Sequence, residues 1–237
     1  MMSLGSLWTQ PVLPPSALLP WGVALSWGVC IAALLWMAAR AWGQPSLRWL
    51  AGAVWLSACG AALWPDVIDW PAQWALAFQT PSAVTLIGLC VWAWRSAQSH
   101  TRAQTPIPAV WVWATWGLGW ALWFDTFNRW PEGWDVSLYN WGFGATALWV
   151  GAGGLLLSTL RAWRRTATLA SVHGVVAAAL LLFALTRWPT GNVWDAVLDP
   201  WLWLLSHVYV LRHVWCRVSD YWRTSKYSRQ NSSDSGD

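Results

Sequence analysis

The sequence predicts an all-α, polytopic membrane protein with seven transmembrane helices, its N-terminus outside and its C-terminus in the cytoplasm. Three observations support this prediction. The 237 residues are 57% hydrophobic and only 10% charged, whereas a soluble domain carries roughly 25% charged residues. Seven apolar stretches of about 18–25 residues are long enough to cross a hydrocarbon core of roughly 30 Å. The charged residues lie almost entirely between these stretches, with opposite signs in alternate gaps.

The charge distribution sets the orientation, because short loops rich in Lys and Arg stay in the cytoplasm. The first, third and fifth gaps and the C-terminal tail hold most of the 14 basic residues: Arg40, Arg48, Arg95, Arg102, Arg161, Arg164, Arg165, Arg212, Arg217, Arg223, Lys226 and Arg229. The other gaps hold most of the 10 acids: Asp66, Asp69, Asp125, Glu132, Asp135, Asp195 and Asp199. The net charge of +4 therefore reflects topology and contact with lipid headgroups, and we expect no nucleic-acid partner.

The first helix is expected over residues 20–40 and the second over 47–64. Residues 1–19 contain three prolines, with a fourth at position 20, and are expected to form a short extended outer segment. No basic residue precedes Arg40, so this start lacks the layout of a signal peptide. Residues 20–223 are expected to form one transmembrane domain.

The third helix is expected over 71–95, with Asp69 as a capping residue before Pro71. Pro81 predicts a kink, because it removes one backbone hydrogen bond. Polar residues surround it: Gln79, Thr80, Ser82 and Thr85. One interpretation is that these side chains satisfy the freed backbone groups. The other is a polar patch, including Gln79, on the path of a solute.

The fourth helix is expected over 107–125 and the fifth over 137–161. Spacings of three and four residues place four indoles on one face of the fourth helix: Trp113, Trp116, Trp120 and Trp123. They could form a wall against a flat hydrophobic ligand such as a porphyrin, quinone or carotenoid. Alternatively they pack against lipid or against small residues, which the fifth helix offers at Gly144, Ala147, Gly151 and Gly154.

The sixth helix is expected over 168–187 and the seventh over 200–218, the latter capped by Asp199 before Pro200. His173 and His213 fall at matched depths of these two helices, which is the arrangement that a bis-histidine haem b needs. Interfacial histidines hydrogen-bonded to neighbours are the commoner alternative. Residues 224–237 are polar and are expected to form a disordered cytoplasmic tail.

The three outer loops resemble one another. Each has a Trp-Pro pair and a second Trp, and the second Trp recurs at a spacing of 60 (134 − 74 and 194 − 134): Trp70-Pro71 with Trp74, Trp130-Pro131 with Trp134, and Trp188-Pro189 with Trp194. This period predicts one helix followed by three repeated helical hairpins. The alternative is convergence, since Trp is favoured at every membrane interface.

The acids of the outer loops, together with Arg129 and Arg187, could converge into one polar rim. Such a rim would suit a cationic solute or a periplasmic partner. Helix capping and ordinary solvation are the alternative. No Asp, Glu, Lys or Arg lies at the centre of a predicted helix, and no nucleotide-binding, hydrolase or metal-site motif occurs. The four cysteines lie in or near apolar stretches and predict no disulfide.

Three functional hypotheses remain. The leading one is a non-enzymatic accessory, assembly or anchoring component of a bacterial inner membrane, with the lipid bilayer and a membrane or periplasmic protein as partners. The second is a small-solute transporter, supported by the repeat, the kink and the acidic rim. The third is a Trp-lined binder of a flat cofactor such as haem, although no cofactor is predicted outright. The candidate ligand- or partner-binding residues are Gln79, Trp113, Trp116, Trp120, Trp123, Asp135, Asp195 and Asp199, with His173 and His213 as haem candidates.

Overall fold

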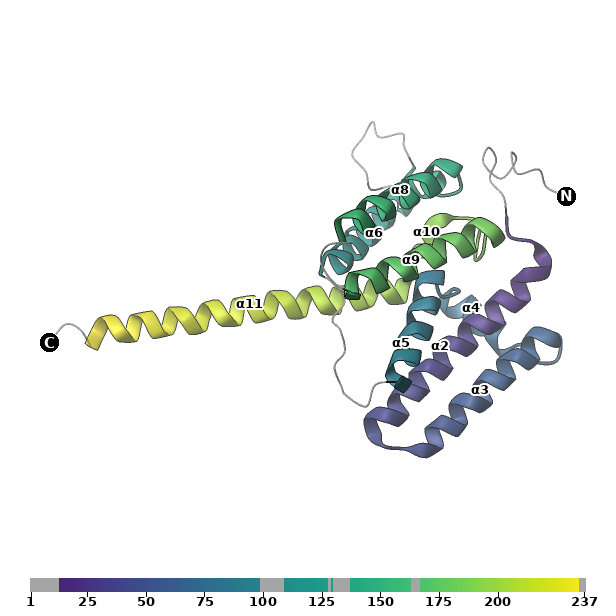
Figure 1. The fold of residues 1–237 in the computed structure, drawn as a ribbon, viewed down its shortest axis with the longest axis horizontal. Coiled ribbons are helices and arrows are strands. Elements are labelled where there is room, and N and C mark those ends of the chain that lie inside the picture. Colours follow the sequence, from purple (N-terminus) through teal and green to yellow (C-terminus); the bar gives the residue numbers. More distant parts are fainter. Residues whose placement is uncertain (1–12, 99–108, 128, 130–136, 163–166, 235–237) are drawn as a thin grey trace.

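The computed structural model describes residues 13–98, 109–127, 129, 137–162 and 167–234, and every regular element in them is helical, as predicted. Figure 1 shows the arrangement. The elements are η1 (Ser16–Leu18), α2 (Leu19–Trp42), α3 (Pro45–Leu63), α4 (Trp70–Phe78), α5 (Ala83–Gln98), α6 (Ala109–Thr126), α7 (Leu138–Trp141), α8 (Ala145–Ala162), α9 (Ala167–Thr186), α10 (Val193–Val197) and α11 (Pro200–Asp234).

Helices α2 and α3 form a hairpin, and α2 also packs against α4 and α5. The turn follows from two residues: Gly43 ends α2 with a positive φ of 66°, and Pro45 begins α3. The two helices approach closely where a Cβ added to Gly28 would lie 2.3 Å from the Cβ of Ala58. Small residues at such contacts are typical of helices that pack in membranes.

The predicted third helix is divided in two, so the prediction of a single kinked helix over 71–95 is wrong. Helices α4 and α5 are bent by 118° at the break. Pro81 supplies no backbone donor, and Ser82 then caps the new helix, with its Oγ accepting the N–H of Thr85 at 3.1 Å. Gln79 adopts φ 60° and ψ 169° at the end of α4, a region populated almost only by glycine.

The second half of the chain packs α8 against α9, α9 against α5 and α10, and α6 against α11. Its core joins α8, α9 and α10 through Ala147, Leu148, Leu180, Phe183, Val193 and Ala196. The predicted fifth helix is also divided, because α7 ends at Trp141 and α8 begins at Ala145. Part of the small-residue face of α8 packs on α9, since Leu180 lies 3.7 Å from a Cβ added to Gly151, whereas a Cβ added to Gly154 meets nothing within 4 Å.

Helix α11 is the longest element and extends away from the other helices toward the C-terminus in Figure 1. Its 35 residues correspond to about 52 Å at 1.5 Å per residue. It includes residues 224–234, for which the sequence predicts disorder. The capping prediction at its start is confirmed, since Oδ1 of Asp199 accepts the N–H of Leu202 at 2.7 Å. The capping prediction for Asp69 is wrong, because its side chain makes no capping hydrogen bond at the start of α4.

Two helical segments are long and apolar enough to span a membrane, Ser16–Trp42 and Pro45–Leu63, and the bent pair α4–α5 makes a third if it counts as one span. The chain is therefore a helical membrane protein. The described residues do not confirm seven spans or the hairpin repeat. One reason is length, since the 16 residues of α5 reach about 24 Å, less than a hydrocarbon core of roughly 30 Å.

Candidate functional site

The segment between α9 and α11, residues 187–199, is a buried loop that includes α10, and we call it the outer hub. Trp188, Asn192, Val193, Ala196 and Asp199 are all at most 5% exposed. Loops normally run over the surface, because a buried loop must find partners for its backbone polar groups. The outer hub finds these partners in several different helices.

Hydrogen bonds join the outer hub to α7. The side-chain amide of Asn192 donates to the carbonyl of Tyr139 at 2.9 Å. The indole N–H of Trp194 donates to the carbonyl of Leu138 at 2.8 Å, and the backbone N–H of Val193 donates to the carbonyl of Gly142 at 3.0 Å. Asn192 also caps α10 by accepting the N–H of Trp194 at 3.0 Å. These bonds fix the outer hub and α7 as one unit.

Three indoles of this region each lie against a glycine. A Cβ added to Gly22 would lie 2.1 Å from Nε1 of Trp188, and one added to Gly142 would lie 2.4 Å from Cδ1 of Trp194. Likewise, a Cβ added to Gly119 would lie 2.1 Å from Cδ1 of Trp203, in the first turn of α11. These distances are far shorter than van der Waals contact, so the three positions require glycine. We call these three glycine–tryptophan contacts the glycine joints. They connect the outer hub and α11 to α2, α7 and α6.

Two carboxylates of the predicted acidic rim cap helices. Asp199 bridges two helix starts, because its Oδ2 accepts the N–H of Ser82 before α5 at 2.8 Å while Oδ1 serves α11. Asp125, near the end of α6, accepts the N–H groups of Leu138 and Tyr139 at 2.9 and 2.7 Å. Negative charge is favourable at a helix N-terminus. The capping alternative therefore describes what these two acids do.

Asp195 lies in α10 with a different set of partners. Its Oδ2 accepts the hydroxyl of Tyr139 at 2.9 Å and that of Thr190 at 2.5 Å. Burial raises the pKa of the Asp195 carboxyl, and the two hydrogen bonds oppose this shift. Burial and the neighbouring Asp195 charge raise the pKa of Tyr139 to about 12. Asp195 is thus a carboxylate held in a poorly solvated position, as functional carboxylates often are.

A groove of about 820 Å³ opens beside the outer hub, and we call it the polar groove. One side comes from the α4–α5 break and another from the end of α6. The remaining walls come from α7, the outer hub and the start of α11. Its lining combines indole rings with hydroxyl, amide and carboxylate groups, including Gln79, Trp123, Tyr139, Thr190, Asp195 and Trp203. The volume falls within the range of small-molecule sites, roughly 300–1,000 Å³.

The four predicted indoles of α6 contact one another in sequence, from Trp113 to Trp116, Trp120 and Trp123. They also pack against α11. The ring centroids of Trp120 and Trp203 are 5.4 Å apart, and those of Trp116 and His207 are 6.0 Å apart. Edge-to-face contacts of this kind stabilise aromatic pairs. The indole face is therefore largely an interface between α6 and α11, and of the four only Trp123 lines the polar groove.

The haem candidates lie against different parts of α6. His173 packs edge-on against Trp111, with ring centroids 5.2 Å apart, and His213 packs against Trp113 at 6.4 Å. Positions two residues apart on a helix point about 200° apart. The two histidines thus contact opposite sides of α6 instead of facing each other. No group of three or more His, Cys, Asp or Glu side chains suited to a metal occurs among the described residues.

The structure brings together Gln79, Trp123, Asp195 and Asp199 at the polar groove, whereas Asp135 lies outside the described residues. The sequence gives no indication of a site role for Tyr139, Thr190, Asn192, Trp203 and His207. One signal of local structure is present, because Asn192 is a favoured N-cap residue at the start of α10. The other residues become relevant only through contacts distant in sequence.

The class that the fold defines is a helical membrane protein with a groove built around a buried loop. The chain matches no family model, no curated protein and no solved structure.

Proposed function

We propose that the protein is a non-enzymatic component of a bacterial inner membrane, an accessory, assembly or anchoring subunit, whose polar groove binds a segment of a partner protein. The observation behind this proposal is the polar groove itself. Its lining mixes aromatic rings with hydrogen-bonding groups, a combination that is enriched where proteins bind one another.

Preorganisation supports this proposal. The hydrogen bonds of Asn192 and Trp194 hold the outer-hub wall of the polar groove to α7. Asp199 holds the same wall to the start of α5. A wall fixed before binding loses little conformational entropy when a partner docks, which favours affinity.

The proposed topology has seven crossings, by α2, α3, the bent α4–α5 pair counted as one crossing, α6, α8, α9 and α11, with the outer hub outside and the C-terminus in the cytoplasm. The alternation of basic and acidic gaps supports this orientation. The composition of α6 supports its inclusion, because Asp125 is its one charged residue and it is rich in Trp, a side chain that is common at membrane interfaces. In this topology α2 precedes three hairpins, α3–α5, α6–α8 and α9–α11.

The test is a pull-down of a C-terminally tagged copy from native membranes, with stoichiometry measured by mass spectrometry. Thr126→Trp places a bulky ring in the polar groove from an exposed position on α6. Ala114→Trp adds the same ring at an exposed position of α6 that does not line the groove. We expect a partner at fixed ratio with the wild type and Ala114→Trp, and loss of that partner with Thr126→Trp. Recovery of the wild type without any partner would refute the accessory function.

A small-solute permease is the second candidate, and the α4–α5 break favours it. Discontinuous helices in transporters expose backbone groups that bind the solute. Here the break places Gln79 and Thr80 at the polar groove. If the protein is recovered alone, Gln79→Leu is expected to abolish solute uptake while expression persists. Unchanged uptake would remove this candidate.

A further inference from the structure

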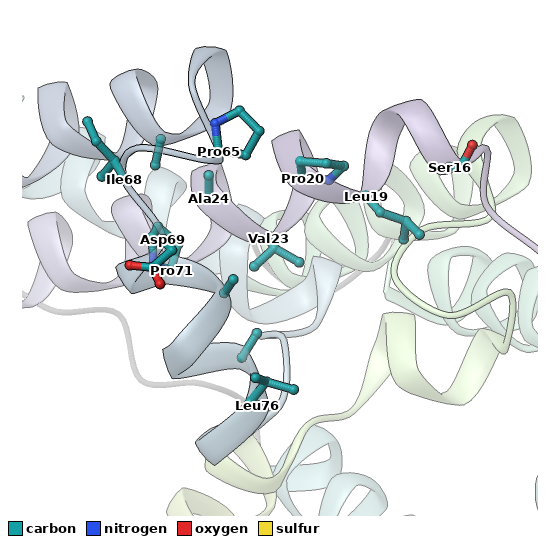
Figure 2. A pocket seen from close by; sticks show the side chains of 13 residues that line it. Ser16, Leu19, Pro20, Val23, Ala24, Pro65, Ile68, Asp69, Pro71 and Leu76 are labelled. Carbon is teal, nitrogen blue, oxygen red and sulfur yellow. The ribbon is translucent and has the colours of Figure 1, made fainter.

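A second groove lies between the start of α2 and α4, and we call it the apolar groove because nearly all of its lining side chains are apolar. Its volume is about 590 Å³. Figure 2 shows Leu19 and Val23 of α2 on one side, Ile68 in the preceding loop, and Pro71 and Leu76 of α4 on the other. Ser16 and Asp69 are the only lining residues with polar side chains among those described.

The position of α4 beside α2 is fixed by packing. The indole N–H of Trp70 donates to the hydroxyl of Ser57 on α3 at 3.0 Å. Trp27 of α2 is 5% exposed and packs edge-on against Trp74, with ring centroids 5.2 Å apart. The apolar groove is therefore a formed feature of the fold and not a gap left by a loosely attached helix.

The surroundings of the apolar groove indicate contact with lipid. It lies on Ser16–Trp42, one of the segments able to span a membrane. Leu76 and Val67, in and beside the groove, are 89% and 79% exposed. Apolar area left in water costs roughly 25 cal/mol per Å², so side chains this exposed are expected to face hydrocarbon. A linear apolar chain from the bilayer suits the shape and chemistry of such a groove.

The charge at the rim of the apolar groove selects among lipids. Asp69 is exposed and accepts one hydrogen bond from the side-chain amide of Gln73 at 2.8 Å. Asp66, three residues earlier, is exposed as well. Residues 64–78 contain no Lys or Arg. This rim complements an ammonium headgroup and repels an anionic one.

We propose that the apolar groove binds one acyl chain of a zwitterionic aminophospholipid, whose primary ammonium group lies at Asp69. The proposed lipid site does not rest on the proposed function, since it needs no protein partner, although Ala75 lines both grooves. Exposed ion pairs contribute only about 0.2–1 kcal/mol. The acyl chain therefore supplies most of the affinity, and Asp69 supplies the preference between headgroups.

The test is native mass spectrometry of the full chain released from nanodiscs of equal phosphatidylethanolamine and phosphatidylglycerol. Ala72→Trp fills the apolar groove from an exposed position on α4. Ala77→Trp adds the same ring at an exposed position of α4 that does not line the groove. We expect wild type and Ala77→Trp to retain phosphatidylethanolamine. Ala72→Trp is expected to retain about tenfold less, the loss that follows from excluding about two methylene groups from an apolar site.

Asp69→Asn tests the headgroup without changing the volume of the apolar groove, and it remains informative if Ala72→Trp does not fold. We expect its preference for phosphatidylethanolamine over phosphatidylglycerol to fall about two- to fivefold. Equal retention of lipid by Ala72→Trp and wild type would overturn the proposed site. Equal retention of both lipids by the wild type would overturn the proposed headgroup.

Discussion

The joint between Gly119 and Trp203 gives the sharpest test of how α6 and α11 are held together. A Cβ added to Gly119 would lie 2.1 Å from Cδ1, 2.3 Å from Nε1 and 2.7 Å from Cγ of the Trp203 ring. Because three ring atoms would be too close, a rotation at the end of a flexible side chain cannot relieve Gly119→Ala. The indole must move, and Trp120, whose ring centroid is 5.4 Å away, must move with it.

The magnitude follows from two opposing terms. Overpacking a well-packed site costs about 1–3 kcal/mol, and replacing glycine by alanine inside a helix returns about 0.8–1.0 kcal/mol. The 2.1 Å approach places Gly119→Ala toward the upper end of the overpacking range. We therefore expect a net loss of about 1–2 kcal/mol in the free energy of unfolding.

Gly117 is the matched control, because it lies on α6 two residues earlier and a Cβ added there meets nothing within 4 Å. Gly117→Ala is expected to be neutral or to stabilise by up to about 1 kcal/mol. The assay is thermal unfolding in detergent followed by circular dichroism, because the 28 tryptophans would mix many signals in fluorescence. Replacing Trp203 by Leu should remove most of the Gly119→Ala penalty, as expected for a directly coupled pair. Equal stability of Gly119→Ala and Gly117→Ala would refute the joint.

Three further outcomes are expected from the same unfolding assay. Gln79→Gly should raise the free energy of unfolding by about 1 kcal/mol, because it relieves backbone strain of about 1–3 kcal/mol. Part of that gain is lost because glycine gives the unfolded chain more conformational entropy. A destabilised variant would contradict the strained conformation. Asp199→Ala should lower the free energy of unfolding by about 1–3 kcal/mol, because the buried start of α5 and the partly buried start of α11 both lose their acceptor; a loss below a few tenths of a kcal/mol would contradict the bridge. The raised pKa of the Asp195 carboxyl means that the fold favours its protonated form. Its contribution to stability is therefore fully present below the ordinary value of 3.8 and lost as the pH rises through the raised pKa. Asp195→Asn should remove this part of the pH dependence, and an unchanged pH profile would contradict the burial of that carboxylate.

The helical class could be predicted from composition, but the breaks within helices could not. Pro81 predicts only a kink when read alone. It becomes a full break because Ser82 caps α5 and its backbone N–H finds the carboxylate of Asp199, 117 residues away in sequence. That contact depends on how the chain folds in three dimensions. No pattern within residues 71–95 contains the information.

The residues of the candidate site also divide into those that the sequence could indicate and those that it could not. Gln79 and Asp195 could be proposed from their polarity in apolar surroundings, and both line the polar groove. Tyr139 could not, because its role depends on the 2.9 Å hydrogen bond to Asp195. The glycine joints were equally hidden, since the pairing of Gly22 with Trp188 spans most of the chain. Long-range packing between a small and a large residue leaves no periodic signal in the sequence.

Asp199 both lines the polar groove and bridges α5 with α11. Loss of partner binding in an Asp199 variant would therefore not by itself show that Asp199 contacts the partner. The two roles separate in Asp199→Asn. Asparagine keeps one oxygen acceptor but no charge, so it can cap only one of the two helix starts well. If capping is the whole role, partner binding should decline only in parallel with stability, and it should recover to the extent that Gly117→Ala raises the stability of the variant. If Asp199 also contacts the bound segment, binding should remain low after stability is restored. Measuring both quantities on the double variant therefore decides whether the outer hub only shapes the polar groove or also contributes a contact to it.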